Sequence, residues 1–166
     1  MKKLAVLITL AALAACSRDR AREAAPGVSM LEGFTMAETA AGASRWRLEA
    51  ASGRLDEKKG RIDFASPRIK FYTDDKVSSE VTSSSGTLLM QSKDAELDGS
   101  VEVTSASDGM RLLTSRLFYA SAKGKIWTDA PVTILRGRTV IKGRGFTANP
   151  DLSEIEIQHQ ETRMAR

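Results

Sequence analysis

Residues with reactive side chains are few in this chain and widely separated. The single histidine, His159, stands near the end of an alternating run, which favours a solvated strand end over a catalytic base. No serine occupies a Gly-x-Ser-x-Gly elbow, and no nucleophile is paired with a base. Asp74 and Asp75 could attract a metal, but adjacent acids in a turn are usually solvated. We therefore expect no catalytic residues, no metal site and no cofactor, and predict that the protein is not an enzyme.

The only cysteine, Cys16, ends a segment with the layout of an export signal. Lys2 and Lys3 precede the mostly apolar residues 4–15, and small residues come directly before the cysteine. As a helix, this segment of about a dozen residues would rise about 18 Å. A helix that spans a bilayer needs about 20 apolar residues, or about 30 Å. Leu-Ala-Ala-Cys resembles a bacterial lipobox, in which the cysteine is acylated and becomes the first mature residue. The alternatives are an ordinary signal peptide with a chance cysteine and a short transmembrane anchor.

Composition divides the rest of the 166-residue chain into a tether, one domain and a tail. Residues 1–15 are expected to be the signal peptide, with Cys16 lipidated. Residues 16–29 are small and charged, end near Pro-Gly and predict a flexible tether. Residues 30–160 predict a single domain, and the polar residues 161–166 a disordered tail. Lys2 and Lys3 supply two of the formal net charge of +4, and no basic stripe remains for nucleic acid.

From Met30 onward, apolar and polar residues alternate with the period of β-strands. Trp46 and Leu48, for example, share one face of their run, and Arg47 lies on the other. Stretches rich in turn-forming residues separate the runs at 56–60, 73–76, 105–109, 121–124 and 149–153. This pattern predicts an all-β sandwich, roll or barrel.

Two segments of the domain resemble each other, because seven residues separate Gly60 from Pro67 and also Gly124 from Pro131. The repetition indicates stacked two-strand units, although chance similarity between short β patterns is an alternative. Each proline is expected to open a strand, where its missing N–H matters least.

Five stretches, in order, resemble the LptC family of lipopolysaccharide transport proteins and the broader group of OstA-like β-jellyrolls. They are Gly33–Glu38, Trp46–Tyr72, the Gly-x-Val-x-Val run at 99–103, and residues 112–134 and 141–157. Together they cover about residues 30–160. The resemblance implies an all-β fold, a single twisted antiparallel β-jellyroll of many short strands after the N-terminal segment.

The resemblance also implies a function in lipopolysaccharide transport. Such proteins sit on the periplasmic face of the inner membrane, receive lipopolysaccharide from an ABC transporter and pass it through an apolar groove to an LptA-like jellyroll. A sealed core is the alternative to a groove for each inward residue. The candidates for the groove lining are Trp46, Leu48, Ile62, Phe64, Ile69, Phe71, Val101, Val103, Ile126 and Ile134.

Sheet edges are the expected partner contacts, because an open jellyroll leaves unpaired backbone groups at both ends. The edge facing the LptA-like partner is expected at Glu154–His159, with Ile155 and Ile157, and the transporter-facing edge near Leu31–Glu38. Gly143 and Gly145 are expected near the first of these edges, where they could permit close backbone approach; an ordinary bend is the alternative.

Two features depart from the family pattern. Relatives commonly keep a transmembrane helix, whereas Cys16 indicates a lipid anchor, and Ser17 favours sorting to the outer membrane. The longer domain resemblance favours the inner membrane. The alternative functions are an envelope lipoprotein that binds another lipid or acts as an assembly scaffold, and a structural lipoprotein with a filled core.

Overall fold

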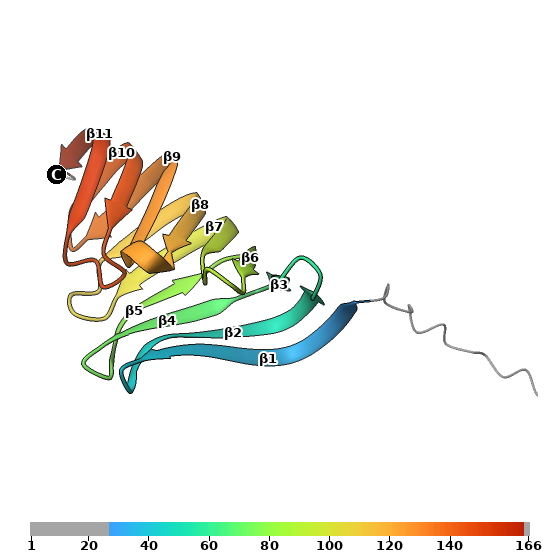
Figure 1. The fold of residues 1–166 in the computed structure, drawn as a ribbon. Helices are drawn as coiled ribbons and strands as arrows, with labels where there is room; N and C mark the ends of the chain where they lie inside the picture. The colour runs from blue at the N-terminus through green and yellow to red at the C-terminus, as the bar shows by residue number, and fades with distance from the viewer. Residues whose placement is uncertain (1–26, 165–166) are drawn as a thin grey trace, which may run out of the picture.

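A computed structural model of the chain describes residues 27–164 (Figure 1). The signal segment, Cys16 and most of the expected tether lie outside the described residues. Within them, all strands belong to one antiparallel sheet, with β1 and β11 at opposite ends of the molecule. The elements are β1 (Val28–Ala40), β2 (Ala43–Asp56), β3 (Arg61–Ala65), β4 (Arg68–Thr73), β5 (Lys76–Thr82), β6 (Ser85–Leu89), β7 (Ala95–Ser105), β8 (Arg111–Ala120), the 3₁₀ turn η1 (Ser121–Lys123), β9 (Lys125–Arg136), β10 (Thr139–Ala148) and β11 (Ile155–Met164).

The strands follow one another up and down across the sheet. β1 pairs with β2, whose two halves pair with β4 and β3, so these two short strands lie end to end in one row. β5 and β6 form the next row in the same way, and both pair with β7. β8, β9, β10 and β11 then follow in sequence order. This connectivity confirms the predicted single antiparallel jellyroll, although the strands run to as many as 14 residues.

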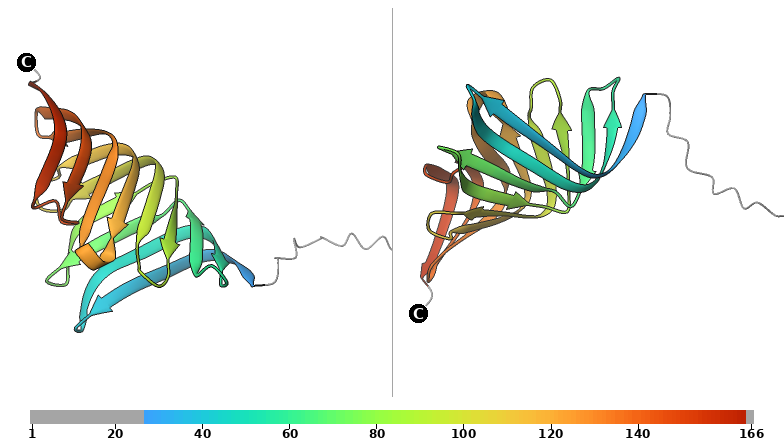
Figure 2. Two further views of the ribbon diagram at one scale, coloured as in Figure 1. Left: turned by 45° about the horizontal axis from the view of Figure 1, so that its top comes forward. Right: turned by 90° about the horizontal axis from the view of Figure 1, so that it is seen from below.

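A line of irregularities crosses the middle of the rows from β3 and β4 to β10. It includes Ser66 and Pro67 between β3 and β4, Ser83 and Ser84 between β5 and β6, and register shifts in β7, β8 and β10. These positions are neighbours: the Ser66 N–H donates to the Ser84 carbonyl at 2.9 Å, and the Ser84 N–H donates to the Gly99 carbonyl at 2.8 Å. Because bulges bend a strand, their alignment folds the whole sheet lengthwise along this line (Figure 2).

Folding along this line brings the strand-end turns into two rows, which we call lip 1 and lip 2. Lip 1 consists of the turns at 41–42, 74–75, 106–110 and 137–138. Lip 2 consists of the turns at 57–60, 90–94, 121–124 and 149–154. The inner face of the sheet lies between the two lips.

Both prolines of the repeated segments lie on the fold line, and both glycines lie on lip 2. Gly60 and Gly124 each end a turn with φ near +60°, a conformation that glycine adopts without strain. Pro67 directly precedes β4, as expected. The prediction for Pro131 is wrong, because this residue lies inside β9. The register of β9 with β8 is broken here, so the missing proline N–H costs no ladder bond.

The sheet also extends beyond the domain boundaries expected from composition. β1 begins at Val28, which pairs with Asp56, and β11 continues to Met164, which pairs with Thr139. Residues 161–164, which were expected to belong to a disordered tail, therefore form the end of β11. The polar sequence there still forms a strand because β10 offers it a full-length partner.

Candidate functional site

The inner face of the folded sheet contains all ten residues predicted to line a groove. Each of them is at most 6% exposed. They come from both sides of the fold line: Trp46, Leu48, Ile69 and Phe71, for example, face Phe64 across the interior. The structure thus brings the predicted residues together on one apolar surface.

The interior between the two half-sheets is filled in this conformation. A cavity of about 10 Å³ remains, lined only by apolar side chains and Tyr119. A cavity needs about 10–15 Å³ of such space to hold one water molecule, so no acyl chain fits without movement of the walls. The structure therefore shows a filled interior without an open groove between the half-sheets.

The lips meet along a seam where an aromatic pair closes the interior. The rings of Phe71 and Tyr119 pack edge to face with their centroids 5.1 Å apart. Above them is a hollow of about 200 Å³, bounded by Arg45 on the side of lip 1 and by Gly124 and Pro150 on lip 2. Burial raises the pKa of the Tyr119 hydroxyl, which keeps this residue neutral at the seam.

A carboxylate on β1 clasps the two lips together near the aromatic pair. Glu38 accepts hydrogen bonds from the indole N–H of Trp46 and, at 3.5 Å, from the hydroxyl of Ser121 on lip 2. The Ser121 N–H in turn donates to Asp94 at 2.9 Å. Separating the lips would break the bond between Glu38 and Ser121 without disturbing a strand ladder.

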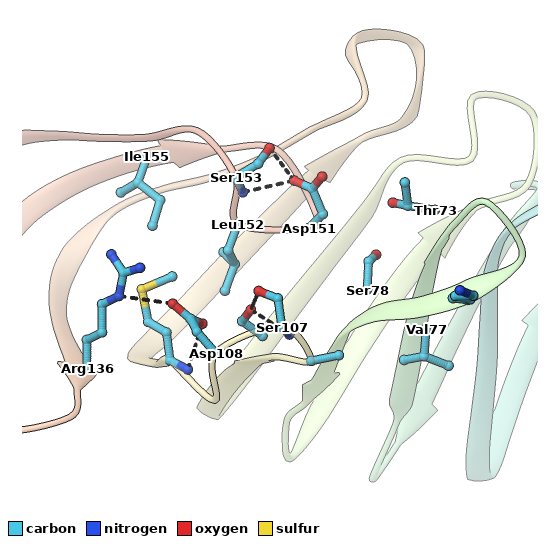
Figure 3. Close-up of a pocket in the computed structure, with 14 residues that line it drawn as sticks. Thr73, Val77, Ser78, Ser107, Asp108, Arg136, Asp151, Leu152, Ser153 and Ile155 are labelled. Carbon is cyan, nitrogen blue, oxygen red and sulfur yellow. Dashed lines mark hydrogen bonds and ion pairs between the residues drawn. The ribbon is translucent and has the colours of Figure 1, made fainter.

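The loop at 149–154 covers the seam toward the β11 end (Figure 3). It starts from lip 2 and reaches β5, where the Ser79 hydroxyl donates to the Pro150 carbonyl. Leu152 of this loop is 6% exposed and belongs to the buried apolar cluster, with φ at +60°. We call residues 149–154 the seam loop.

Outside the seam loop lies a larger, more polar hollow of about 630 Å³. Its wall on lip 1 includes Asp108 and Arg136, joined by an ion pair of 2.9 Å. A hydrogen bond from the Met110 N–H holds the pKa of Asp108 below its usual value. Leu152 and Ile155 supply apolar surface on the opposite side.

Sequence reasoning did not identify Tyr119, Leu152 or the clasp at Glu38. Tyr119 lies on the inner face because the shift between Thr114 and Phe118 resets the alternation of β8. Leu152 is a lone apolar residue in a polar turn stretch, a signal that could have been noticed. Glu38 gives no such signal, because its partners are distant in sequence.

The two ends of the sheet are edge strands. β1 pairs only with β2, and β11 pairs only with β10. Ile155 and Ile157 lie on the edge strand β11, at positions opposite Ala148 and Phe146. Gly143 and Gly145 lie on β10, which is paired on both sides, so they are one strand away from the edge.

Gly143 nevertheless determines how closely β11 approaches. A Cβ at this position would lie 2.4 Å from the Ile157 Cγ2 atom and 2.7 Å from the His159 carbonyl oxygen. Only a residue without a side chain allows the two strands to pair here. Gly145 adopts φ +77° at the bulge of β10, which is the conformation expected at a bend.

Among residues 27–164, no group of three or more His, Cys, Asp or Glu side chains could hold a metal ion. Over the same described range, no helix is long and apolar enough to cross a membrane.

A single antiparallel sheet, folded lengthwise over an apolar interior and ending in free edge strands, defines an open β-jellyroll. Its fold is similar to that of LptH, the LptA-homologous periplasmic component of the lipopolysaccharide transport device of Pseudomonas aeruginosa. The TM-score is 0.58 at 10% sequence identity, over 73% of this chain and 95% of that chain. Among curated proteins, no match to the sequence was found.

Residues 4–164 match the family model described as lipopolysaccharide-assembly, LptC-related. The chain belongs to this family, as the sequence resemblance predicted, and has a role in lipopolysaccharide transport.

Proposed function

We propose that this protein receives lipopolysaccharide from an inner-membrane ABC transporter and passes it through its apolar interior to an LptA-like jellyroll. The observation that carries the proposal is the closed seam. Two apolar half-sheets meet there, and the aromatic pair Phe71–Tyr119 closes the seam between them. An acyl cargo could separate these half-sheets without unfolding the sheet.

The energetics support a transient site. Burial of each CH₂ group of an acyl chain contributes about 0.8 kcal/mol. In the closed form the apolar side chains of the two half-sheets are already buried against each other. A lipid would replace these contacts, so its binding free energy would be only the difference between lipid–protein and protein–protein contacts. Such a groove would hold lipopolysaccharide long enough for transfer, yet release it to the next carrier.

The edge strands suggest the direction of transfer. We propose that β1 adds to a sheet of the transporter and that β11 adds to the LptA-like jellyroll, as expected from the sequence. Each edge strand offers a free row of backbone N–H and C=O groups for strand addition. The interiors of the joined jellyrolls would then form one continuous apolar path.

The proposed location is the periplasmic face of the inner membrane, with Cys16 carrying the lipid anchor. Both the signal segment and Cys16 lie outside the described residues, so sequence alone supports this part of the proposal. Mass spectrometry of the N-terminal peptide from cells would test the acylation of Cys16.

Lipid analysis of the whole chain purified from growing cells tests the proposed function. We expect lipopolysaccharide to copurify and to be enriched over phospholipids relative to its share in the envelope, because its several acyl chains bury the most CH₂ groups. Phospholipid without lipopolysaccharide would favour a protein that binds another lipid. The absence of any lipid would favour a filled core and a scaffold role.

A further inference from the structure

Lip 2 carries a row of lysines, most of which form no ion pair with the rest of the described domain. Lys58 and Lys59 lie in its first turn, Lys93 in the second and Lys123 in the third. Neighbouring turns are two rows apart, or about 10 Å at the usual strand spacing. These three turns contain two acidic residues, Glu57 and Asp94, so cations predominate in them, whereas the fourth turn of lip 2 carries Asp151 and Glu154 and no lysine.

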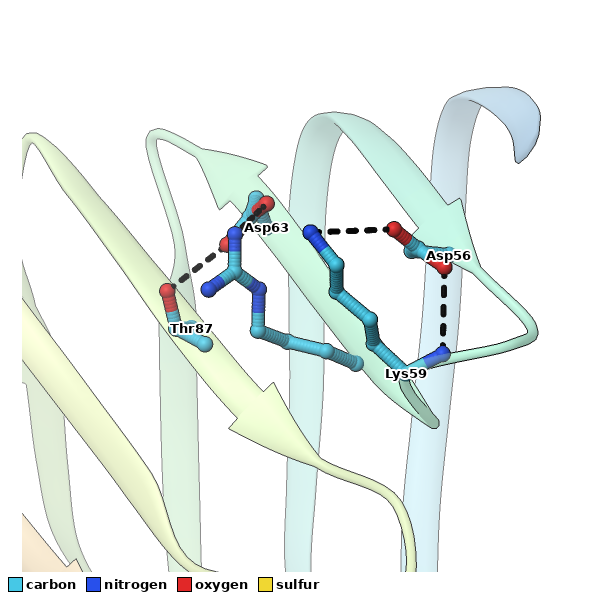
Figure 4. Close-up of polar contacts among 5 residues, drawn as sticks. Asp56, Lys59, Asp63 and Thr87 are labelled. Carbon is cyan, nitrogen blue, oxygen red and sulfur yellow. Dashed lines mark hydrogen bonds and ion pairs between the residues drawn. The ribbon is translucent and has the colours of Figure 1, made fainter. Parts of the chain in front are cut away.

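Three of these lysines are available to a partner. Lys59 pairs with Asp56 at 3.6 Å, as Figure 4 shows. In the part of the chain that the structure describes, no ion pair involves Lys58, Lys93 or Lys123. Asp94, beside Lys93, accepts a hydrogen bond from the Ser121 N–H and forms no ion pair with Lys93 or Lys123 in this part of the chain.

An apolar patch adjoins this row on the outer face of the sheet. Trp127 stacks on Phe118 with ring centroids 4.3 Å apart, and Trp127 is 41% and Leu89 45% exposed. These three residues border a hollow of about 530 Å³, together with two cations, Arg61 and Lys123, and two carboxylates, Asp94 and Glu96. This patch is a surface separate from the seam and the inner face, because its side chains lie on the opposite side of the strands.

Arg61, which lines the hollow, is held by a neighbouring carboxylate. Its guanidinium donates through Nη2 to Asp63, which also accepts a bond from Thr87 (Figure 4). Its buried Nε atom has no hydrogen-bond partner among the described residues.

The N-terminal segment joins the domain at the same lip. Val28 pairs with Asp56 at the end of β2, and the Gly27 carbonyl accepts a hydrogen bond from the Glu57 N–H. Gly27 also lies against Lys58, whose side-chain carbons are 3.4 Å from the position of a Cβ on Gly27. The ten residues from 17 to 26 span at most about 36 Å. A membrane-inserted N-terminus would therefore hold lip 2 close to the bilayer.

We propose that the first three turns of lip 2 and the patch of Leu89, Phe118 and Trp127 dock on the surface of an anionic lipid bilayer. The lysines attract the lipid phosphates, and the tryptophan and its apolar neighbours enter the headgroup boundary. Tryptophan suits this position because its ring is apolar and its N–H remains hydrated. Docking would fix the orientation of the seam relative to the membrane before any partner binds.

The two tryptophans of the chain make a direct test possible. Trp127 belongs to the patch, whereas Trp46 is 4% exposed in the interior. The whole chain is reconstituted in vesicles that contain a lipid with a nitroxide quencher near the headgroup. In Trp46→Phe, we expect loss of Trp127 emission in phosphatidylglycerol–phosphatidylcholine vesicles and not in phosphatidylcholine alone. In Trp127→Phe, the emission of Trp46 should persist in both.

Charge variants test the role of the lysines. Combined Lys58→Gln, Lys93→Gln and Lys123→Gln should abolish the quenching of Trp127. The matched set Lys70→Gln, Lys76→Gln and Lys142→Gln loses the same charge elsewhere and should retain it. Equal quenching in both sets, or none in the chain without lysine substitutions, would overturn the proposal.

A measurement on the unsubstituted chain tests the same proposal without variants, so it does not depend on whether the variants fold. Amine labelling followed by mass spectrometry should show that anionic vesicles protect Lys58, Lys93 and Lys123 more than Lys76. Equal protection would contradict docking. Because these vesicles contain no lipopolysaccharide, the result is independent of the proposed transport function.

Discussion

Replacing Leu152 with asparagine is expected to accelerate lipopolysaccharide loading by about tenfold. Leu152 fastens the seam loop through its buried side chain, and truncation of a buried leucine costs about 2–5 kcal/mol. Part of this cost is recovered, because leucine at φ +60° is strained by about 1–2 kcal/mol and asparagine tolerates that backbone. The closed position therefore loses about 1–3 kcal/mol, and each 1.4 kcal/mol shifts the closed-to-open equilibrium tenfold. The loading rate of the purified whole chain with lipopolysaccharide measures this effect.

Leu152→Met is the matched control, since methionine keeps the apolar volume. It should load at nearly the rate of the unsubstituted protein. Ser79→Ala removes the hydroxyl that holds the Pro150 carbonyl and should lie between the two. If a folded Leu152→Asn protein loads no faster than Leu152→Met, the seam loop is not the barrier to entry.

Replacing Gly143 with valine is expected to detach β11 from the sheet. The new Cβ would lie 2.7 Å from the His159 carbonyl oxygen, a backbone atom that moves only with its strand. Such overpacking typically costs 1–3 kcal/mol, and here releasing the edge strand relieves it. Hydrogen exchange of the β11 amides should become faster by at least about tenfold, and binding to an LptA-like partner should weaken.

Arg144→Val introduces the same side chain at the next position. Arg144 is exposed; its Cα partner on β11 is His159 in a regular register, and its partner on β9 is Pro131, next to the register shift. This variant should keep β11 protected and retain partner binding. Protection of β11 in Gly143→Val at the level of Arg144→Val would refute the packing argument. Normal partner binding with a released β11 would instead refute β11 as the partner edge.

The inner face was predictable because the alternation of apolar and polar residues along a strand shows directly which side chains share a face. Trp46, Leu48, Ile69 and Phe71 follow a strict period of two within their own strands, so the sequence assigned their shared face correctly. The turns were predictable for a similar reason, since residues such as Asp74 and Asp75 adopt positive φ more readily than most.

The fold line was not predictable from a single sequence. It depends on Ser66 and Ser100, which adopt φ +48° although serine gives no strong signal for that conformation. Neighbouring strands align these bends, and that alignment is a tertiary property. The same holds for the seam, because Tyr119 faces Phe71 only after the sheet has folded over.

The residues predicted for the partner edge lie on two neighbouring strands. Ile155 and Ile157 lie on β11, whereas the glycines lie one strand inward. Sequence identified Gly143 as a place of close approach and could not say which strand approaches. The approaching strand is β11 itself rather than a partner.

Photo-crosslinking in growing cells tests the central claim, that the inner face carries lipopolysaccharide, most directly. A photoreactive residue is placed at Ile69 or Phe71, which line the interior cavity, and separately at Lys70, which lies between them on the outer face of β4. We expect lipopolysaccharide adducts at Ile69 and Phe71 and none at Lys70. Adducts at Lys70 alone, or at none of the three positions in a folded protein, would contradict a transport groove and identify the interior as a sealed core.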